Sequence, residues 1–132
     1  GDRPRVDHLT GVDELDAGVA VVLSSDSDVA SYRPLDTIAS AIERRTLAGA
    51  SIGENQALTL DEALLAHTRT AAYALGMEDR IGSLVPGALA DIVILDGDLR
   101  TSTPQEIRGM ATWLTVIDGR VVYAAEGAPS WE

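Results

Sequence analysis

The stretch that decides the predicted fold class is Val19-Ala-Val-Val-Leu-Ser-Ser-Asp26. Its first five residues are apolar, and three of them are β-branched valines. Apolar strands that do not alternate with polar residues are usually buried on both faces, as in parallel sheets. We therefore expect a buried strand over 19–23, followed by a polar cluster over 24–28 at its carboxyl end.

Helical patterns flank this stretch on both sides. Thr10 is a candidate N-cap for a short helix or turn before the strand. A helix is expected over about 34–47. Pro34 is compatible with its first turn, where the missing N–H of proline costs no hydrogen bond. Thr59-Leu-Asp-Glu62 has the spacing of a capping box, in which the Thr and Glu side chains each bond the other's backbone N–H. It predicts a helix over about 60–75.

The second half of the chain has the pattern of antiparallel strands. A second apolar strand is expected over 90–95, and Thr103-Pro-Gln-Glu106 is a second capping box that opens one short helix. Strands over 112–117 and 120–123 flank Asp118-Gly119, a pair typical of a two-residue hairpin turn. Residues 124–132, which include Gly127 and Pro129, are expected to form a loosely held tail.

These elements do not add up to a self-sufficient domain. A strand buried on both faces needs a neighbour on each side, and parallel strands require a crossover connection of a dozen or more residues. The chain has room for a single unit of this kind, over 19–47. The strands after residue 90 form a separate antiparallel piece that is too small to enclose a core. Taken alone, the sequence predicts an incomplete α/β fold.

Composition excludes several classes of function. The net charge of −11 disfavours nucleic acids and anionic membrane surfaces as partners. All ten basic residues are arginines, and there is no lysine. The absence of cysteine excludes disulfides, zinc–thiolate sites and a thiol nucleophile. No apolar stretch approaches the roughly 20 residues that span a bilayer, and no targeting signal is visible, so we expect a cytoplasmic protein.

Asp26 is the candidate site residue. A carboxylate just beyond the carboxyl end of a buried parallel strand lies where α/β barrels carry their active sites, and it can bind a metal or accept a proton from metal-bound water. The alternative is that Asp26 and Asp28 cap the following turn. His8 and His67 lack the spacing of a two-histidine metal site. Asp91, in the second strand, is expected to be a buried structural acceptor.

Blocks of sequence from about 17 to 123 resemble the C-terminal region of the amidohydrolase superfamily, closest to its amidohydrolase-3 branch. The block over 17–26 resembles that family's final barrel strand, which ends in Gly-Ser-Asp. Further matching blocks follow in the family's order: Pro34-Leu35, Ala41–Arg44, Ala57–Leu64, Thr70–Leu75, Asp79–Gly87, Leu89–Asp96 and Thr115–Tyr123. Ser24 stands where the family usually has Gly, Asp28 where it usually has Pro, and Ala88 where it commonly has Lys.

The resemblance implies an α/β fold made of the C-terminal fragment of a (β/α)8 barrel followed by part of a small β-sandwich. Residues 1–83 would hold the last barrel strand and its flanking helices, 84–123 the sandwich part and 124–132 the tail. The family's divalent metals, usually zinc, are held mainly by histidines and often a carboxylated lysine. The matching Asp26 implies one metal ligand that also acts as general base. The family's other ligands have no counterpart in this chain.

The resemblance also implies what would complete the chain. We expect it to be part of a metal-dependent hydrolase of C–N bonds, amide or cyclic amide, in small molecules, and to be inactive alone. Metal would bind only in the complete enzyme. The expected partner is the remaining N-terminal part of that enzyme, or a second copy, because the edges of the closing strands lack partners. The alternative is a non-catalytic structural or interaction module derived from an amidohydrolase.

Overall fold

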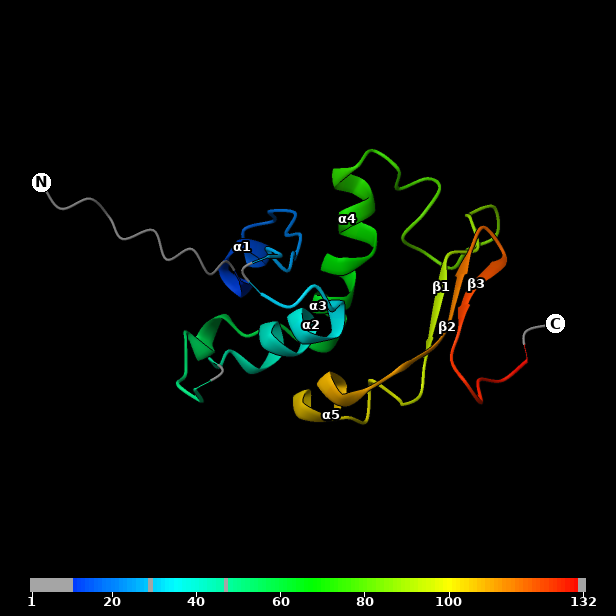
Figure 1. Ribbon diagram of the computed structural model, residues 1–132. Coiled ribbons are helices and arrows are strands. Elements are labelled where there is room, and N and C mark those ends of the chain that lie inside the picture. Colours follow the sequence, from blue (N-terminus) through cyan, green and yellow to red (C-terminus); the bar gives the residue numbers. More distant parts are fainter. Residues whose placement is uncertain (1–10, 29, 47, 131–132) are drawn as a thin grey trace, which may run out of the picture.

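A computed structural model describes residues 11–130 apart from Val29 and Leu47. The candidate N-cap Thr10 and His8 lie outside the described residues. The structure is α/β, with a helical part and a three-stranded antiparallel sheet placed side by side and joined at the base by α5 (Figure 1). None of the helices in the described part of the chain has the length and hydrophobicity needed to span a bilayer.

The helical part consists of short elements. They are α1 (Val12–Asp16), α2 (Pro34–Glu43), the 3-10 turn η1 (Glu54–Gln56), α3 (Leu60–His67) and α4 (Arg69–Ala74). Helix α2 packs against α3 and against α5 (Pro104–Gly109), so it lies at the centre of the helices. Its buried residues Ile38 and Ala41 contact Leu58 and Ala63 in one apolar cluster. On its other side, Ala39 contacts Ile107 and Met110.

Two arginines connect α2 and α5 by hydrogen bonds, one from the start of α2 and one from the end of α5. Arg33, the N-cap of α2, donates from its guanidinium to the backbone oxygens of Arg108 and Met110, each at 3.1 Å. Arg108, in the last turn of α5, donates in return to Glu43 at 2.6 Å and to Ser40 Oγ at 3.1 Å. The first pair of bonds satisfies carbonyls that a helix end leaves without partners. Since α5 leads into the central strand of the sheet, these bonds fix the sheet's attachment to the helices.

The three strands are β1 (Ile92–Leu95), β2 (Thr112–Ile117) and β3 (Arg120–Ala124), in the order β1-β2-β3. The predicted hairpin is confirmed, with Asp118 at φ 49° and Gly119 at φ 75°, as its tight turn requires. Asp91 is solvent-exposed, so its predicted burial is wrong. Its predicted role as an acceptor is confirmed, because its Oδ1 accepts the backbone N–H of Asp118 at 2.8 Å and holds the hairpin turn against β1.

Both predicted capping boxes are confirmed. Thr59 Oγ1 accepts the backbone N–H of Glu62 at 3.3 Å, and Glu62 Oε2 accepts that of Thr59 at 2.7 Å. Thr103 and Glu106 repeat the arrangement at the start of α5 with distances of 3.3 and 2.7 Å. The backbone bonds, together with those from the two Thr hydroxyls, lower the pKa of both glutamates.

Two predicted helices were too long. Helix α2 ends at Glu43, and Arg44 follows in the left-handed conformation at φ 51°. The helix expected over 60–75 divides at Thr68, whose angles of φ −118° and ψ −86° are not helical. Gly82 lies close beside the break, since a Cβ there would lie 2.9 Å from the Thr68 carbonyl oxygen. The incoming loop therefore occupies the surface beside the break.

The strand predicted over 19–23 does not form within the described chain, where Val19 and Val22 are exposed. No strand is assigned before residue 92 in the described residues. The physical reason is that a strand is defined by ladder hydrogen bonds to a neighbour, and the described part of the chain offers none at this position. The segment is nevertheless extended across the helices, and its contacts define the candidate site.

Candidate functional site

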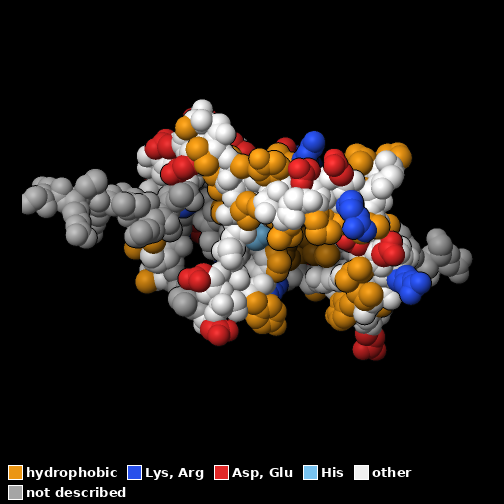
Figure 2. Space-filling model, turned by 90° about the horizontal axis from the view of Figure 1, so that it is seen from above, with side chains coloured by type: hydrophobic (Ala, Val, Ile, Leu, Met, Phe, Trp, Pro, Cys, Tyr) orange, Lys and Arg blue, Asp and Glu red, His pale blue; other side chains and the backbone are white. Residues whose placement is uncertain are grey.

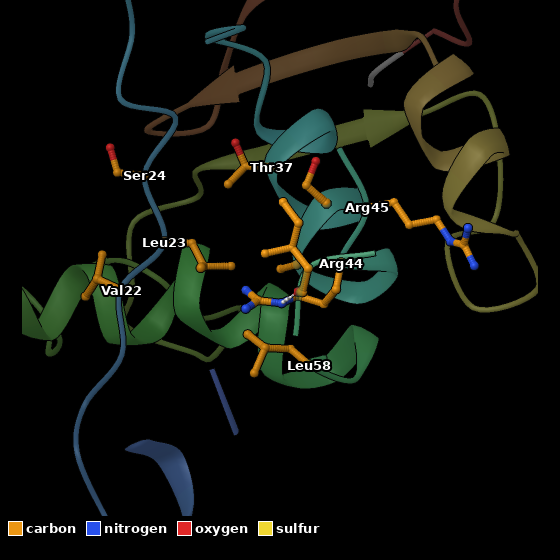
Figure 3. Close-up of a pocket in the computed structure, with 10 residues that line it drawn as sticks. Val22, Leu23, Ser24, Thr37, Arg44, Arg45 and Leu58 are labelled. Atoms are coloured by element: carbon orange, nitrogen blue, oxygen red, sulfur yellow. Dashed lines mark hydrogen bonds between the residues drawn. The ribbon is translucent and has the colours of Figure 1, made fainter. Parts of the chain in front are cut away.

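Residues 19–26, here called the extended segment, begin with the exposed Val19 and Ala20 and alternate between packed and open positions from Val21 onward. Val21 is 6% exposed, and Leu23 packs against the cluster of Ile38, Ala41, Leu58 and Ala63. Val22, Ser24 and Asp26, the alternate residues, are exposed. Figure 3 shows Leu23 reaching toward α2, while Val22 and Ser24 project from the opposite side. This alternation is that of a β-strand, whose successive side chains point to opposite faces.

Asp26 ends the open side of the extended segment. Its backbone takes φ 49°, in the left-handed region that residues other than glycine enter at a cost of roughly 1 kcal/mol. Its N–H donates to Ser24 Oγ at 3.3 Å. Among the described residues, none forms a hydrogen bond or an ion pair with its carboxylate, and its side of the segment is uncovered. This carboxylate is therefore available to a ligand or to another segment.

A cavity of about 320 Å³ lies between the extended segment and α2 (Figure 3). Its walls are Leu23 and Leu58 with the hydroxyl-bearing Ser24, Thr37 and Ser40, and with Arg44. The guanidinium of Arg44 donates from Nε to the Ile52 carbonyl at 3.1 Å. Sequence analysis missed Arg44, because the left-handed backbone that turns its side chain toward the segment depends on where α2 ends.

A second cavity of about 480 Å³ lies at the other end of the extended segment, beside Ala20. Helix α4 lines it with Arg69 and Tyr73, and Glu78 and Asp79 complete its charged rim. Among the described residues, no backbone hydrogen bond joins residues 20–25 to another segment. In a sheet, such unpaired edges are where neighbouring strands pair.

His67 is the last residue of α3, and it is half-buried. Its Nε2 atom is buried, with no hydrogen-bond partner among the described residues. Burial lowers the pKa of this imidazole, so the neutral form is favoured.

The metal chemistry predicted for Asp26 requires further ligands beside it. Within the described ranges, no group of three or more His, Cys, Asp or Glu side chains is arranged to hold a metal ion. A protein zinc site takes three or four ligands from the protein. The carboxylate of Asp26 can supply one of them, so the described residues do not complete a site.

Comparisons with known proteins place this geometry in a family. Residues 1–123 match the amidohydrolase family. An N-substituted formamide deformylase of Arthrobacter pascens is 36% identical over 114 residues, covering 86% of this chain and 21% of that protein. An imidazolonepropionase of Chloroflexus aggregans is 35% identical over 113 residues, covering 85% and 24%. The crystal structure of an amidohydrolase from Thermotoga maritima matches with a TM-score of 0.64 at 26% identity, covering 84% and 24%. The chain spans about a fifth to a quarter of these proteins' lengths.

Proposed function

The chain belongs to the amidohydrolase family, and from this premise we propose that it is the C-terminal part of a metal-dependent hydrolase. Its substrates would be small molecules with a cleavable C–N bond, as the name of the deformylase relative suggests. The observation that carries the proposal is the extended segment, which packs one face on the helices, leaves the other open and ends at the uncovered carboxylate of Asp26.

Asp26 would act as a general base in this enzyme. Its carboxylate would accept a proton as the oxygen of a water molecule bonds to the scissile carbonyl carbon, and would return the proton to the leaving nitrogen when the C–N bond breaks. A zinc ion, when bound, lowers the pKa of water and polarises the carbonyl. Asp26 would provide one of its ligands, and the others would come from outside this chain.

The remaining N-terminal part of the same enzyme is the proposed partner. Strands from it would pair with the two edges of the extended segment, where residues 20–25 make no backbone hydrogen bond to another described segment. It would also cover apolar side chains that the structure leaves exposed. Figure 2 shows hydrophobic side chains gathered near the middle of one face. A soluble monomer rarely exposes a large continuous apolar area unless it is an interface.

Replacing Asp26 by Asn in the complete enzyme tests the catalytic part of the proposal. We expect Asp26→Asn to lower kcat at least about a hundredfold, because loss of a general base costs that much. The measurement is hydrolysis of a panel of N-substituted formamides and cyclic amides, with zinc content determined in parallel.

Asp28→Asn is the matched control, since this carboxylate lies in the same polar cluster, and it should retain near-native turnover. Equal activity of Asp26→Asn and the unmodified enzyme would contradict the proposal. Stoichiometric zinc in the assembled protein is the expected result. Its absence, together with inactivity on the whole panel, would favour the non-catalytic module instead.

A further inference from the structure

Helices α3 and α4 carry a row of exposed side chains beside the start of the extended segment. Leu65 is 50% exposed and Tyr73 is 61% exposed, and Arg69 between them is also exposed. Residues four apart are neighbours along one side of a helix, and all three line the cavity at Ala20 despite the break at Thr68. Figure 1 shows α4 rising beyond α2, on the side away from α5. Large side chains thus face solvent where the described chain folds nothing over them.

The charged groups of this cavity have no partners. The side chain of Arg69 makes no hydrogen bond or ion pair with any described residue, and the same holds for Glu78 and Asp79 on the rim. Opposite charges therefore border one cavity without reaching each other. An occupant that brings a carboxylate to Arg69 and a basic group to the acidic rim would pair both signs of charge. Arginine and tyrosine are also the residue types enriched at protein interfaces.

The length of the chain indicates what covers this surface. The chain spans about a fifth to a quarter of its relatives' lengths, so most of a complete enzyme lies outside it. The cavity is continuous with the unpaired edge of the extended segment, because Ala20 borders it and residues 20–25 bond to no other described backbone. A strand that pairs with this edge brings its flanking residues to the cavity. A free amino acid could meet the same charges, but it would leave the exposed Leu65 and Tyr73 uncovered.

We propose that this cavity, with the exposed row beside it, is a docking surface for the remaining part of the enzyme. Its occupant is a protein segment with an apolar side chain that covers Leu65 and Tyr73, a carboxylate that pairs with Arg69, and an Arg or Lys that meets the acidic rim. The contact fixes the start of the extended segment in the assembled protein. The identity of the partner as an enzyme rests on the proposed function, whereas the contact itself requires no metal.

The test is the accessibility of Tyr73→Cys in the complete enzyme, measured as its rate of reaction with iodoacetamide. This chain has no cysteine, and a thiol reacts only where the reagent reaches it. The unmodified enzyme gives the background from cysteines elsewhere. We expect Tyr73→Cys to react at least about tenfold more slowly than Thr101→Cys, because protected sites react only through local opening. Thr101 lies in an exposed turn outside the docking surface.

Leu65→Cys is a second reporter, which keeps the Tyr73 ring in place and should be protected to a similar degree. If both reporters react as fast as Thr101→Cys, the docking surface is open in the complete enzyme and the inference is wrong.

Arg69→Glu and its matched control Arg80→Glu test the charge pairing. Both arginines are exposed and make no side-chain bond within the described part of the chain, but only Arg69 lines the cavity. Combined with Tyr73→Cys, Arg69→Glu should speed the labelling at least about tenfold, because it sets like charges against each other in the contact. Arg80→Glu should leave the rate unchanged. Equal rates in the two combinations would contradict the pairing of Arg69 with a carboxylate.

Hydrolysis of the amide panel by the same protein separates the two proposals. An active enzyme with an open docking surface would overturn this inference and leave the proposed function standing. Protected reporters in a protein that is inactive on the panel and binds no zinc would support the docking surface and contradict the proposed function. Protection that disappears on dilution would identify a second copy as the occupant, and protection that requires added glycine would identify a zwitterion. Either result would contradict the inference.

Discussion

Gly82 and Gly76 have similar backbone angles but different surroundings. Both have positive φ, 83° and 66° respectively. A Cβ on Gly82 would lie 2.8 Å from the Ala72 side chain and 2.9 Å from the Thr68 carbonyl oxygen, whereas a Cβ on Gly76 would meet nothing within 4 Å. Gly82 therefore has two roles. It adopts a positive φ, and its missing side chain lets the loop approach the helix break closely.

Alanine at these two glycines separates strain from crowding. Gly82→Ala is expected to lower the free energy of unfolding by about 2–4 kcal/mol, the sum of the left-handed strain and a clash with backbone atoms. Gly76→Ala carries the strain alone and should cost about 1 kcal/mol. Urea denaturation followed by circular dichroism measures both values. Equal losses in the two variants would show that the loop moves aside without cost.

At the scale of elements, the start of α3 is stabilised by the ionised carboxylate of Glu62. Bonds from the Thr59 backbone N–H and hydroxyl hold the pKa of Glu62 below its ordinary range. A carboxylate with a lowered folded pKa stabilises the fold fully above its unfolded pKa of about 4.3, and this contribution disappears as the pH falls through the folded pKa. The capping box should therefore matter more at neutral pH than in acid.

Thr59→Ala tests this dependence. We expect a loss of about 1 kcal/mol in the free energy of unfolding at pH 7, typical of a removed N-cap, and a smaller loss at pH 3, because acid protonates more of the Glu62 carboxylate. Urea denaturation at the two pH values measures the difference. Thr101→Ala is the control, because that hydroxyl makes only a 3.4 Å bond in a loop. A loss from Thr59→Ala that does not vary with pH would mean that Glu62 contributes nothing.

At the scale of the whole molecule, the sheet has one covered and one uncovered face. Leu114 and Val116 of β2 are buried. Thr115, which lies between them, belongs to the opposite face and pairs with Val93 of β1 and Tyr123 of β3. Val93 is 58% exposed and Ile117, on the same face, 53%. This uncovered face would contact the remaining part of the enzyme, and without that part it is available to a second copy.

Polar substitution of the uncovered sheet face should reduce self-association of this chain. The double variant Val93→Thr/Ile117→Thr removes two aliphatic contacts of roughly 1 kcal/mol each, which corresponds to at least about tenfold weaker association. Sedimentation velocity over a range of concentrations measures it. Tyr32→Thr alters an exposed side chain outside the sheet and should leave association unchanged. If the unmodified chain stays monomeric at high concentration, this face does not mediate self-association.

The sequence by itself determined the features that depend on neighbours a few residues apart. The two capping boxes and the Asp118-Gly119 turn form where predicted, because each is closed by bonds within about four residues. Asp26 is predicted to be a site residue from its position after an apolar run, whereas its left-handed backbone and its bond to Ser24 could not be foreseen.

Only the tertiary structure decided what depends on distant partners. Residues 19–23 have the composition of a strand but form no ladder, because the described chain supplies no strand to pair with them. The helix predicted over 60–75 breaks at Thr68, where Gly82 of a later loop packs against it. Local pattern sets the conformation that a segment prefers, whereas burial and strand pairing depend on which other segments arrive beside it.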